Sequence, residues 1–407
     1  MASVRNMSDV DDAGPVRTFE LPVTDRVLYG AGAAGRAREE ARRMGMTRPL
    51  ILASGTLATT TRVVDDLADG LGAAGVFHEV PPHVPRRTVL AVAERYREVG
   101  ADGLVSLGGG SPIDCAKGVA LCLSEGVDRE QSLAEYRIRY RYPGPPQIPA
   151  LTGRPPHHLA LSTTLSGAEF TSIAGITDTE RGAKDLYSAD VLCPGVVILD
   201  PELAVFTPRD LWLSSGVRAI DHIVEGVYSA RHTPVTDAVL LEALSILAAD
   251  LLPSADEPLD LGRRGNCQVA AWMAIMHLRN VSTGLSHGLG HQLGALLGVP
   301  HGVTSCILLP HAMDFNRPVT AGRQALLAPA LGVDVHGLDE LGAAAAVADC
   351  IRSLLAQMGV PTRLSEIGVE RSHFEAIVEE AMNDMILAGN PRAVSIVDAL
   401  ALLEAAY

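Results

Sequence analysis

The segment 103–123 restricts the possible folds more strongly than any other part of the chain. It starts with an apolar run, GLVSL, continues directly into the four residues GGGS, and then shows helical spacing from 112 to 123. A short continuous apolar run is typical of a strand that helices cover on both faces of a parallel sheet. Glycines let the backbone approach an anion, and the start of a helix carries a partial positive charge. The segment therefore predicts a strand, a phosphate-binding loop and a helix.

The glycine loop on its own leaves two interpretations open. A GGGS sequence can also form a tight turn that binds nothing, and it differs from the GxGxxG fingerprint of an ordinary Rossmann dehydrogenase. The residues after it favour ligand binding, because Asp114 and Lys117 are expected on the first turn of the helix, beside the ligand.

The rest of the first half repeats the alternation of strand and helix, which predicts a parallel sheet with right-handed crossovers. The stretch 125–156, rich in proline and arginine, interrupts this pattern and is expected to leave the surface as a long excursion. Further strands are predicted at 26–29, 49–53, 76–80, 159–162 and 196–199, and further helices at 35–44, 61–71 and 88–99.

After residue 200 the apolar spacing is that of helices alone. Three regions follow from this change: a loose tail at 1–14, an α/β dinucleotide-binding domain at 15–200 and a helical catalytic domain at 201–407. The helices of the second domain are predicted at 208–229, 234–252, 266–279, 283–297, 338–358 and 371–383.

Composition excludes several classes of protein. The formal net charge of −15 argues against nucleic-acid binding, which needs a basic face. The six cysteines form no close CxxC pair, so we expect reduced thiols, and the N-terminus has no apolar segment of a signal peptide. Residues 281–313 lack charged side chains, but their four histidines and two prolines indicate a buried polar site instead of a membrane span. We expect a cytoplasmic protein with no membrane partner.

The histidines of the second half form a candidate site. His287 and His291 are four residues apart in a predicted helix and therefore share one face, and His222 and His301 flank them along the chain. Three imidazoles could bind a catalytic zinc and leave one coordination position open. The alternative is that these histidines are hydrogen-bonded residues of the core.

These motifs together resemble the iron-type, or group III, alcohol dehydrogenases, which belong with the dehydroquinate synthase-like proteins. The run GGGSPIDCAK is similar to their pyrophosphate-binding segment GGGSxxDxAK, and the likeness extends to Asn390-Pro391-Arg392. The resemblance implies an N-terminal parallel-sheet dinucleotide-binding domain, a C-terminal helical domain and an active site between them. It also implies NADH or NADPH as cofactor and, commonly in this family, a dimer or a larger oligomer; we expect a homodimer.

The resemblance further implies which residues contact the cofactor. Ser162-Thr163-Thr164 matches the family's PTT element, and Lys184 stands where the family has a lysine near the ribose and nicotinamide. Ser54 replaces an aspartate that repels a 2′-phosphate in many NAD-preferring members, so we expect NADPH to be tolerated. The expected cofactor contacts are Gly108, Gly109, Gly110, Ser111, Asp114, Lys117, Thr163, Thr164, Lys184 and Ser54.

One departure from the family pattern decides the expected chemistry. Metal-binding members carry GxDAxxHxxE, in which the aspartate is a ligand, and this chain has Arg218 at that position. If a metal is present, the resemblance makes His222, His287 and His301 its ligands. A guanidinium has no lone pair for a metal and is well suited to grip a carboxylate. Maleylacetate reductases also lack the aspartate, and His83-Val84-Pro85 and TTLSGAEFT (163–171) resemble their sequences.

The sequence therefore predicts an NAD(P)H-dependent oxidoreductase that reduces an unsaturated or keto carboxylic acid without a catalytic metal. Arg218 would bind the acid, and His291 or His222 would supply the proton or polarise the oxygen. Two alternatives remain: an Fe- or Zn-dependent alcohol or aldehyde dehydrogenase, with Asp221 as a possible substitute ligand, and a lyase or cyclase on the same scaffold.

Overall fold

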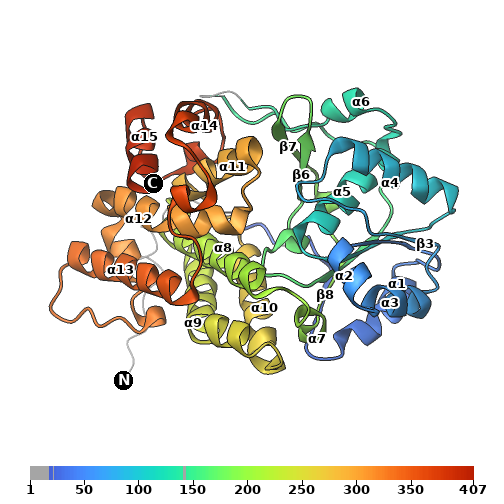
Figure 1. Ribbon diagram of the computed structural model, residues 1–407, viewed down its shortest axis with the longest axis horizontal. Coiled ribbons are helices and arrows are strands. Elements are labelled where there is room, and N and C mark those ends of the chain that lie inside the picture. Colours follow the sequence, from blue (N-terminus) through green and yellow to red (C-terminus); the bar gives the residue numbers. More distant parts are fainter. Residues whose placement is uncertain (1–17, 22, 141–143) are drawn as a thin grey trace, which may run out of the picture.

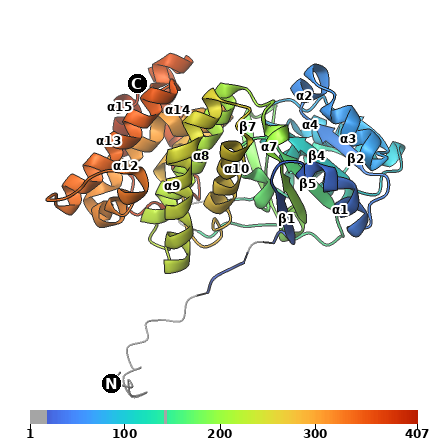
Figure 2. The same ribbon diagram turned by 90° about the horizontal axis from the view of Figure 1, so that it is seen from below.

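The computed structural model describes residues 18–21, 23–140 and 144–407. The predicted tail at 1–14 lies outside the described residues. The described chain forms a sheet-containing half and a helical half that lie side by side (Figures 1 and 2).

The first half is built on a six-stranded sheet with the order β1-β8-β5-β4-β2-β3, in which every neighbouring pair is parallel. The prediction of a parallel α/β domain is confirmed. The strands are β1 (Arg26–Tyr29), β2 (Leu50–Ala53), β3 (Gly75–Phe77), β4 (Leu104–Gly108), β5 (His158–Ser162) and β8 (Val196–Leu199). The helices are η2 (Ala33–Arg36), α1 (Ala37–Arg43), α2 (Gly55–Thr60), α3 (Val63–Leu71), α4 (Arg86–Glu98), α5 (Gly110–Glu125) and α6 (Glu130–Ala134).

The central strands are apolar without alternation because both faces of the sheet are covered. Along β2, Leu50 and Leu52 belong to the core under α4 and α5, whereas Ile51 and Ala53 belong to the core under α1 and α3. All four side chains are buried. A strand that is buried on both faces loses the polar–apolar alternation of a half-exposed strand.

An antiparallel hairpin that the sequence analysis did not predict reaches toward the helical half. It consists of β6 (Ile173–Asp178) and β7 (Ala183–Ser188), preceded by η3 (Ala168–Phe170) and followed by η4 (Asp190–Leu192). The sequence AKDLYS of β7 is mostly polar and half-buried, so it has no strand-like apolar pattern. Its pairing with β6 places Lys184 opposite Thr177.

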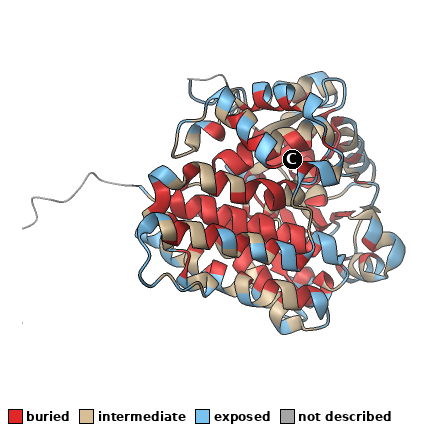
Figure 3. Ribbon diagram, turned by 60° about the vertical axis from the view of Figure 1, so that its left-hand side comes forward, coloured by how far each residue is buried: buried red, intermediate tan, exposed pale blue. Residues whose placement is uncertain are grey.

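The helical half is arranged around α8, whose residues Trp212–Tyr228 are all buried. Figure 3 shows buried ribbon, in red, through the interior of this half. The predicted helical domain is confirmed, and its elements are α7 (Pro201–Ala204), α8 (Arg209–Tyr228), α9 (Pro234–Asp256), α10 (Leu261–Ile275), α11 (Leu285–Leu297), α12 (His301–Ala325), η5 (Pro329–Leu331), α13 (Glu340–Met358), η6 (Leu364–Ile367), η7 (Arg371–His373), α14 (Phe374–Ala381), η8 (Leu387–Gly389) and α15 (Ile396–Ala405).

The long helix α12, together with α15 and the four-residue helix α7, was not predicted from the sequence. Helix α12 contains Pro310 and Pro318, and each proline removes one backbone hydrogen bond from the helix. Packing of α12 against α8 and α13 offsets that loss. Among the described helices, α13 is the one long and apolar enough to cross a membrane, and its apolar side chains Val347, Ile351 and Leu355 are buried in the protein.

The first turn of α12 lies so close to α8 that only glycine fits at position 302. A Cβ on Gly302 would come within 2.5 Å of the backbone oxygen of Ser214. Since neither helix backbone can shift easily, this contact fixes the distance between the start of α12, where His301 lies, and α8.

We therefore expect Gly302→Ala to lower the free energy of unfolding by about 1–3 kcal/mol, the usual cost of overpacking. The matched control is Gly70→Ala in α3, where a Cβ meets nothing within 4 Å. That change should be neutral or slightly stabilising, because alanine favours the helix by about 0.5–1 kcal/mol. Urea denaturation of both variants measures the difference, and equal stabilities would contradict the close approach.

Candidate active site

A cavity of about 680 Å³ lies between the two halves and is lined by all the predicted catalytic and metal-ligand residues and by two of the predicted cofactor contacts. The sheet half contributes Asp114 from α5 and Lys184 from β7, and the predicted excursion contributes Ile138 and Tyr140. The helical half contributes Arg218 and His222 from α8, His287 and His291 from α11, and His301 from the start of α12.

The glycine loop joins the carboxyl end of β4 to α5, as predicted. Gly108 has a φ of 141°, and a Cβ there would come within 3.1 Å of Ser54 and Pro112 side-chain atoms. A Cβ on Gly109 would lie 2.9 Å from the Thr164 side chain. The loop, Ser54 and Thr164 thus surround a place where only backbone fits, and the amides at the start of a sixteen-residue helix are available there for a phosphate.

Lys117 lies behind this loop instead of beside a ligand. Its side chain is fully buried, and the ammonium donates to the backbone oxygens of Ala168 and Ile173 at 2.7 Å and to Thr171 Oγ1 at 3.2 Å. The sequence analysis expected Asp114 and Lys117 on the first turn of the helix, but α5 begins at Gly110, so both residues lie on its second turn. We assign it a structural role, holding the segment 168–173 against α5.

Arg218 enters the cavity from α8. Its Nη1 donates to Ser305 Oγ at 3.2 Å and lies 3.7 Å from Asp221 Oδ2, so Arg218 and Asp221 form an ion pair three residues apart on the helix. Burial lowers the pKa of Arg218, and the charges of Asp221 and Glu225 oppose that shift. The guanidinium is therefore a cation that contacts one hydroxyl and one carboxylate, and its other N–H groups are available to a ligand.

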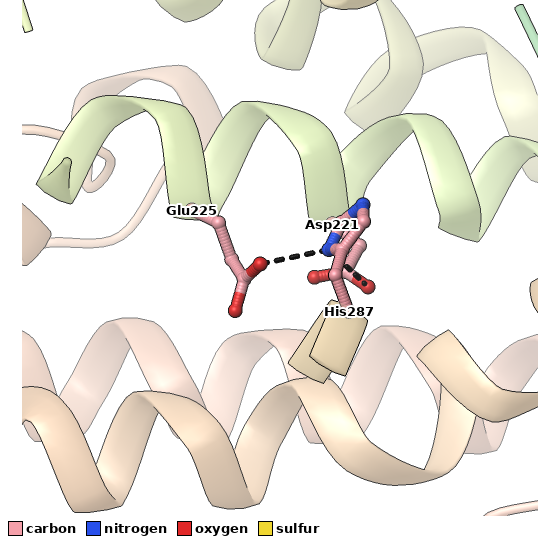
Figure 4. Close-up of side chains that lie close together, drawn as sticks. All are labelled: Asp221, Glu225 and His287. Carbon is pink, nitrogen blue, oxygen red and sulfur yellow. Dashed lines mark ion pairs between the residues drawn. The ribbon is translucent and has the colours of Figure 1, made fainter. Parts of the chain in front are cut away.

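Asp221, Glu225 and His287 form a buried cluster (Figure 4), in which Asp221 is the ion-pair partner of Arg218. Glu225 accepts the backbone N–H groups of Gly284 at 2.6 Å and Ser286 at 2.9 Å, so it caps the start of α11. Asp221 Oδ2 accepts the hydroxyls of Ser286 at 2.8 Å and Ser305 at 2.6 Å. These bonds satisfy both oxygens of Glu225 and Oδ2 of Asp221, whereas Asp221 Oδ1 is buried and has no hydrogen-bond partner among the described residues.

The ionisation of this cluster is shifted by its surroundings. Burial, followed by repulsion from Glu225, raises the pKa of Asp221 to about 7. Burial also raises the pKa of Glu225. His287 Nδ1 lies 2.7 Å from Glu225 Oε2 and 3.5 Å from Asp221 Oδ2, but neither ring nitrogen has hydrogen-bond geometry with any described residue.

The other imidazoles surround the same space. The ring of His222 lies 4.7 Å from that of His287, and the ring of His301 lies 5.5 Å from that of His291, measured between centroids. Burial holds the pKa values of His222, His287 and His301 well below the usual range, and the charge of Arg218 lowers them further. These three rings are therefore neutral at neutral pH.

Two contacts at the cavity join groups from distant parts of the chain. Lys184 Nζ lies 3.4 Å from His301 Nε2, across the two halves. His291 Nδ1 lies 3.0 Å from Asp384 Oδ2. Sequence reasoning missed Asp384, although it stands only six residues before the Asn390-Pro391-Arg392 motif. It also gave no role to Glu225 or Ser305.

A glycine loop that leads into a helix of the sheet half and a histidine-lined cavity between the two halves fit a nicotinamide-dependent oxidoreductase. Family models agree over nearly the whole described chain. Residues 24–201 match "Iron-containing alcohol dehydrogenase" and residues 212–407 match "Fe-containing alcohol dehydrogenase family, C-terminal". The chain belongs to the iron-containing alcohol dehydrogenase family.

Its relatives act on different substrates. The chain is 31% identical to lactaldehyde reductase of Escherichia coli (strain K12) over 392 residues, 95% of this chain and 98% of that protein. It is 30% identical to maleylacetate reductase of Pseudomonas sp. (strain P51) over 386 residues, 95% and 96% of the two chains. The solved structure of a 1,3-propanediol oxidoreductase, 28% identical, matches with a TM-score of 0.89 over 96% of this chain and all of that one.

A buried carboxyl beside the cavity makes stability depend on pH. Burial raises the pKa of Glu169 from 4.5 to about 7, against the hydrogen bond from Ser162 and the charge of Lys117. The folded state therefore holds this proton more tightly than the unfolded chain. The stabilisation is complete below pH 4.5 and is lost as the pH rises to about 7.

We expect Glu169→Gln to remove this dependence. Relative to the wild type, the variant should gain roughly 2–3 kcal/mol of unfolding free energy between pH 5 and pH 8, since one pKa unit is worth about 1.4 kcal/mol. Urea denaturation at both pH values measures the gain, and Glu379→Gln, at an exposed position of α14, is the control. A constant difference between wild type and variant would contradict the raised pKa.

Proposed function

We propose that this protein reduces a keto or unsaturated carboxylic acid with NADH or NADPH, and that Arg218 binds the carboxylate of the substrate. The observation that carries this proposal is the guanidinium in the cavity wall, which Ser305 and Asp221 hold from one side. A guanidinium can donate two parallel hydrogen bonds to a carboxylate, and such charge-assisted pairs are the strong ones.

The residues present do not fit the metal of the family. The position that supplies a carboxylate ligand in the family carries Arg218, whose positive charge repels a divalent cation. Within the described residues, the one set of three possible ligands whose atoms all lie within 4.8 Å of one another is Asp221, Glu225 and His287. Glu225 already accepts two backbone amides and the hydroxyl of Tyr228, and Asp221 Oδ2 already accepts two serine hydroxyls.

The nicotinamide cofactor fits the residues of the first half. The start of α5 at Gly109 and Gly110, with Thr164 alongside, would hold the pyrophosphate, and Ser54 would face the adenosine ribose without repelling a 2′-phosphate. Lys184 and Asp114 line the cavity between the two halves. When bound, the cofactor supplies the hydride.

The proton would come from His291. Burial lowers the pKa values of His222 and His287 well below their usual range, so both rings are neutral. A neutral ring can orient or polarise an oxygen, but it is not the acid of the reaction. His291 lines the cavity, its side chain is 20% exposed and it contacts a carboxylate. Proton transfer by a positioned side chain contributes roughly 10²- to 10⁴-fold to the rate.

A second candidate function is that of a metal-dependent alcohol or aldehyde dehydrogenase. Two observations favour it: the high structural similarity to 1,3-propanediol oxidoreductase and the buried nitrogens of His287 and His301 that have no hydrogen-bond partner among the described residues. Substrate and metal assays distinguish the two candidates.

The first assay compares an acid with an aldehyde. We expect Arg218→Lys to lower kcat/KM for maleylacetate roughly 10- to 100-fold, because lysine keeps the charge but loses the bidentate fork. The same variant should change kcat/KM for lactaldehyde, which has no carboxylate, far less. Oxidation of NADH and NADPH at 340 nm measures both, with Arg38→Lys, at an exposed position of α1, as the control. An equal effect on the two substrates would contradict the role of Arg218.

The second assay measures metal. We expect protein purified from iron- and zinc-supplemented cultures to hold substoichiometric metal and to keep its activity after dialysis against a chelator. The matched variant is Arg218→Asp, which supplies the carboxylate that the family uses and should raise the melting temperature when Fe²⁺ or Zn²⁺ is added. One tightly held metal ion per wild-type chain, lost together with activity, would establish the second candidate.

A further inference from the structure

The carboxylate nearest to His291 comes from a turn near the end of the chain. Asp384 lies between α14 and η8, and its side chain is 10% exposed. Its Oδ2 lies 3.0 Å from His291 Nδ1 and accepts a hydrogen bond from Gln292 at 3.2 Å. Its Oδ1 accepts the backbone N–H of Ile386 at 2.9 Å. Both oxygens are thus fixed, one by the turn and one by α11.

The turn itself is anchored to the start of α11. Asn390, at the end of η8, accepts the backbone N–H of Leu285 at 3.1 Å and exchanges hydrogen bonds with Asn316 at 2.8 and 2.9 Å. A Cβ on Gly284 would lie 2.4 Å from Asn390 Oδ1, so glycine is required for this approach. The segment that carries Asp384 and the helix that carries His291 are therefore held together at two points.

We propose that Asp384 is a positioning residue for His291. By accepting a hydrogen bond from Nδ1–H it fixes the tautomer and the orientation of the ring, and Nε2, on the opposite side of the ring, exchanges a proton with the substrate. This inference rests on the proposed function, in which His291 is the proton donor.

His291 is the only acid that the reduction needs. With a keto acid, hydride from the nicotinamide forms a C–H bond at the carbonyl carbon, and the π electron pair of the C=O bond moves to the oxygen. That oxygen takes the proton from Nε2 of the His291 imidazolium. The ring is left neutral, with its remaining proton on Nδ1 and directed at Asp384, ready to regain a proton from water.

The alternative is that Asp384 only caps the turn, by accepting the backbone N–H of Ile386. Two variants distinguish this capping role from the positioning role. Asp384→Ser keeps a short oxygen for the N–H of Ile386 but does not reach Nδ1 of His291. Asp384→Asn keeps the size of the side chain but only one acceptor oxygen, so an amide that accepts the N–H of Ile386 turns its NH2 group toward Nδ1 of His291. A capping role predicts wild-type kcat in both variants, whereas a positioning role predicts a loss of kcat in both.

The experiment is a double-mutant cycle with His291→Ala, assayed as NADH oxidation with maleylacetate. We expect His291→Ala to lower kcat roughly 10²- to 10⁴-fold. Asp384→Ser should lower kcat roughly 10- to 100-fold, as for other partners that orient a histidine, with little change in the dissociation constant for NADH. The double variant should be no slower than His291→Ala, because residues that act through each other are not additive. Glu379→Ala, at an exposed position of α14, should match the wild type.

The outcomes distinguish this inference from the function on which it rests. If His291→Ala keeps wild-type turnover, the proposed proton donor is wrong and the inference fails with it. If His291→Ala is slow, but Asp384→Ser turns over like the wild type or the two losses multiply in the double variant, the proposed function stands and only the positioning role is overturned. NADH binding and thermal unfolding of each variant verify that the chain is folded.

Discussion

The buried positive charge of Arg218 is the constraint around which the helical half is arranged. A guanidinium in a protein interior needs compensating charge and hydrogen bonds, since desolvation of an unpaired ion costs several kcal/mol. Asp221 and Glu225 supply that charge from the same helix, and Ser305 supplies a hydrogen bond from α12. The same two carboxylates bind Ser286 and the first amides of α11. The contacts around this charge thus connect three helices, α8, α11 and α12, at the cavity.

This arrangement also explains why the histidines behave as they do. Rings that could bind a metal in the family are close to a permanent cation here, and the cation together with burial keeps His222, His287 and His301 neutral. Neutral imidazoles next to a guanidinium can bind and polarise an anionic oxygen. The exchange of one acidic residue for a basic one therefore changes the electrostatics of the whole cavity and not only a single contact.

The sequence predicted what depends on local patterns and missed what depends on distant contacts. Apolar strands, the glycine loop and the four-residue spacing of His287 and His291 all follow from short windows of sequence. The hairpin β6–β7 did not, because β7 is mostly polar and is held by its partner strand. Helix α12 was not predicted because its two prolines are typical of helix ends. Asp384 was missed because it lies 93 residues from His291 in the sequence. The position of Lys117 was misjudged because its acceptors belong to a later loop.

The two lysines of the chain, Lys117 and Lys184, differ in a way that is useful to a chemist. Lys117 is enclosed, and its ammonium hydrogens are directed at protein oxygens, so an acylating reagent has no access to it. Lys184 lines the cavity, and burial lowers its pKa, which increases the fraction of nucleophilic free amine. Of the two lysine side chains, amine-directed labelling of the folded enzyme thus reaches only Lys184, in the cavity. A fluorophore or crosslinker could therefore be installed there without engineering a cysteine.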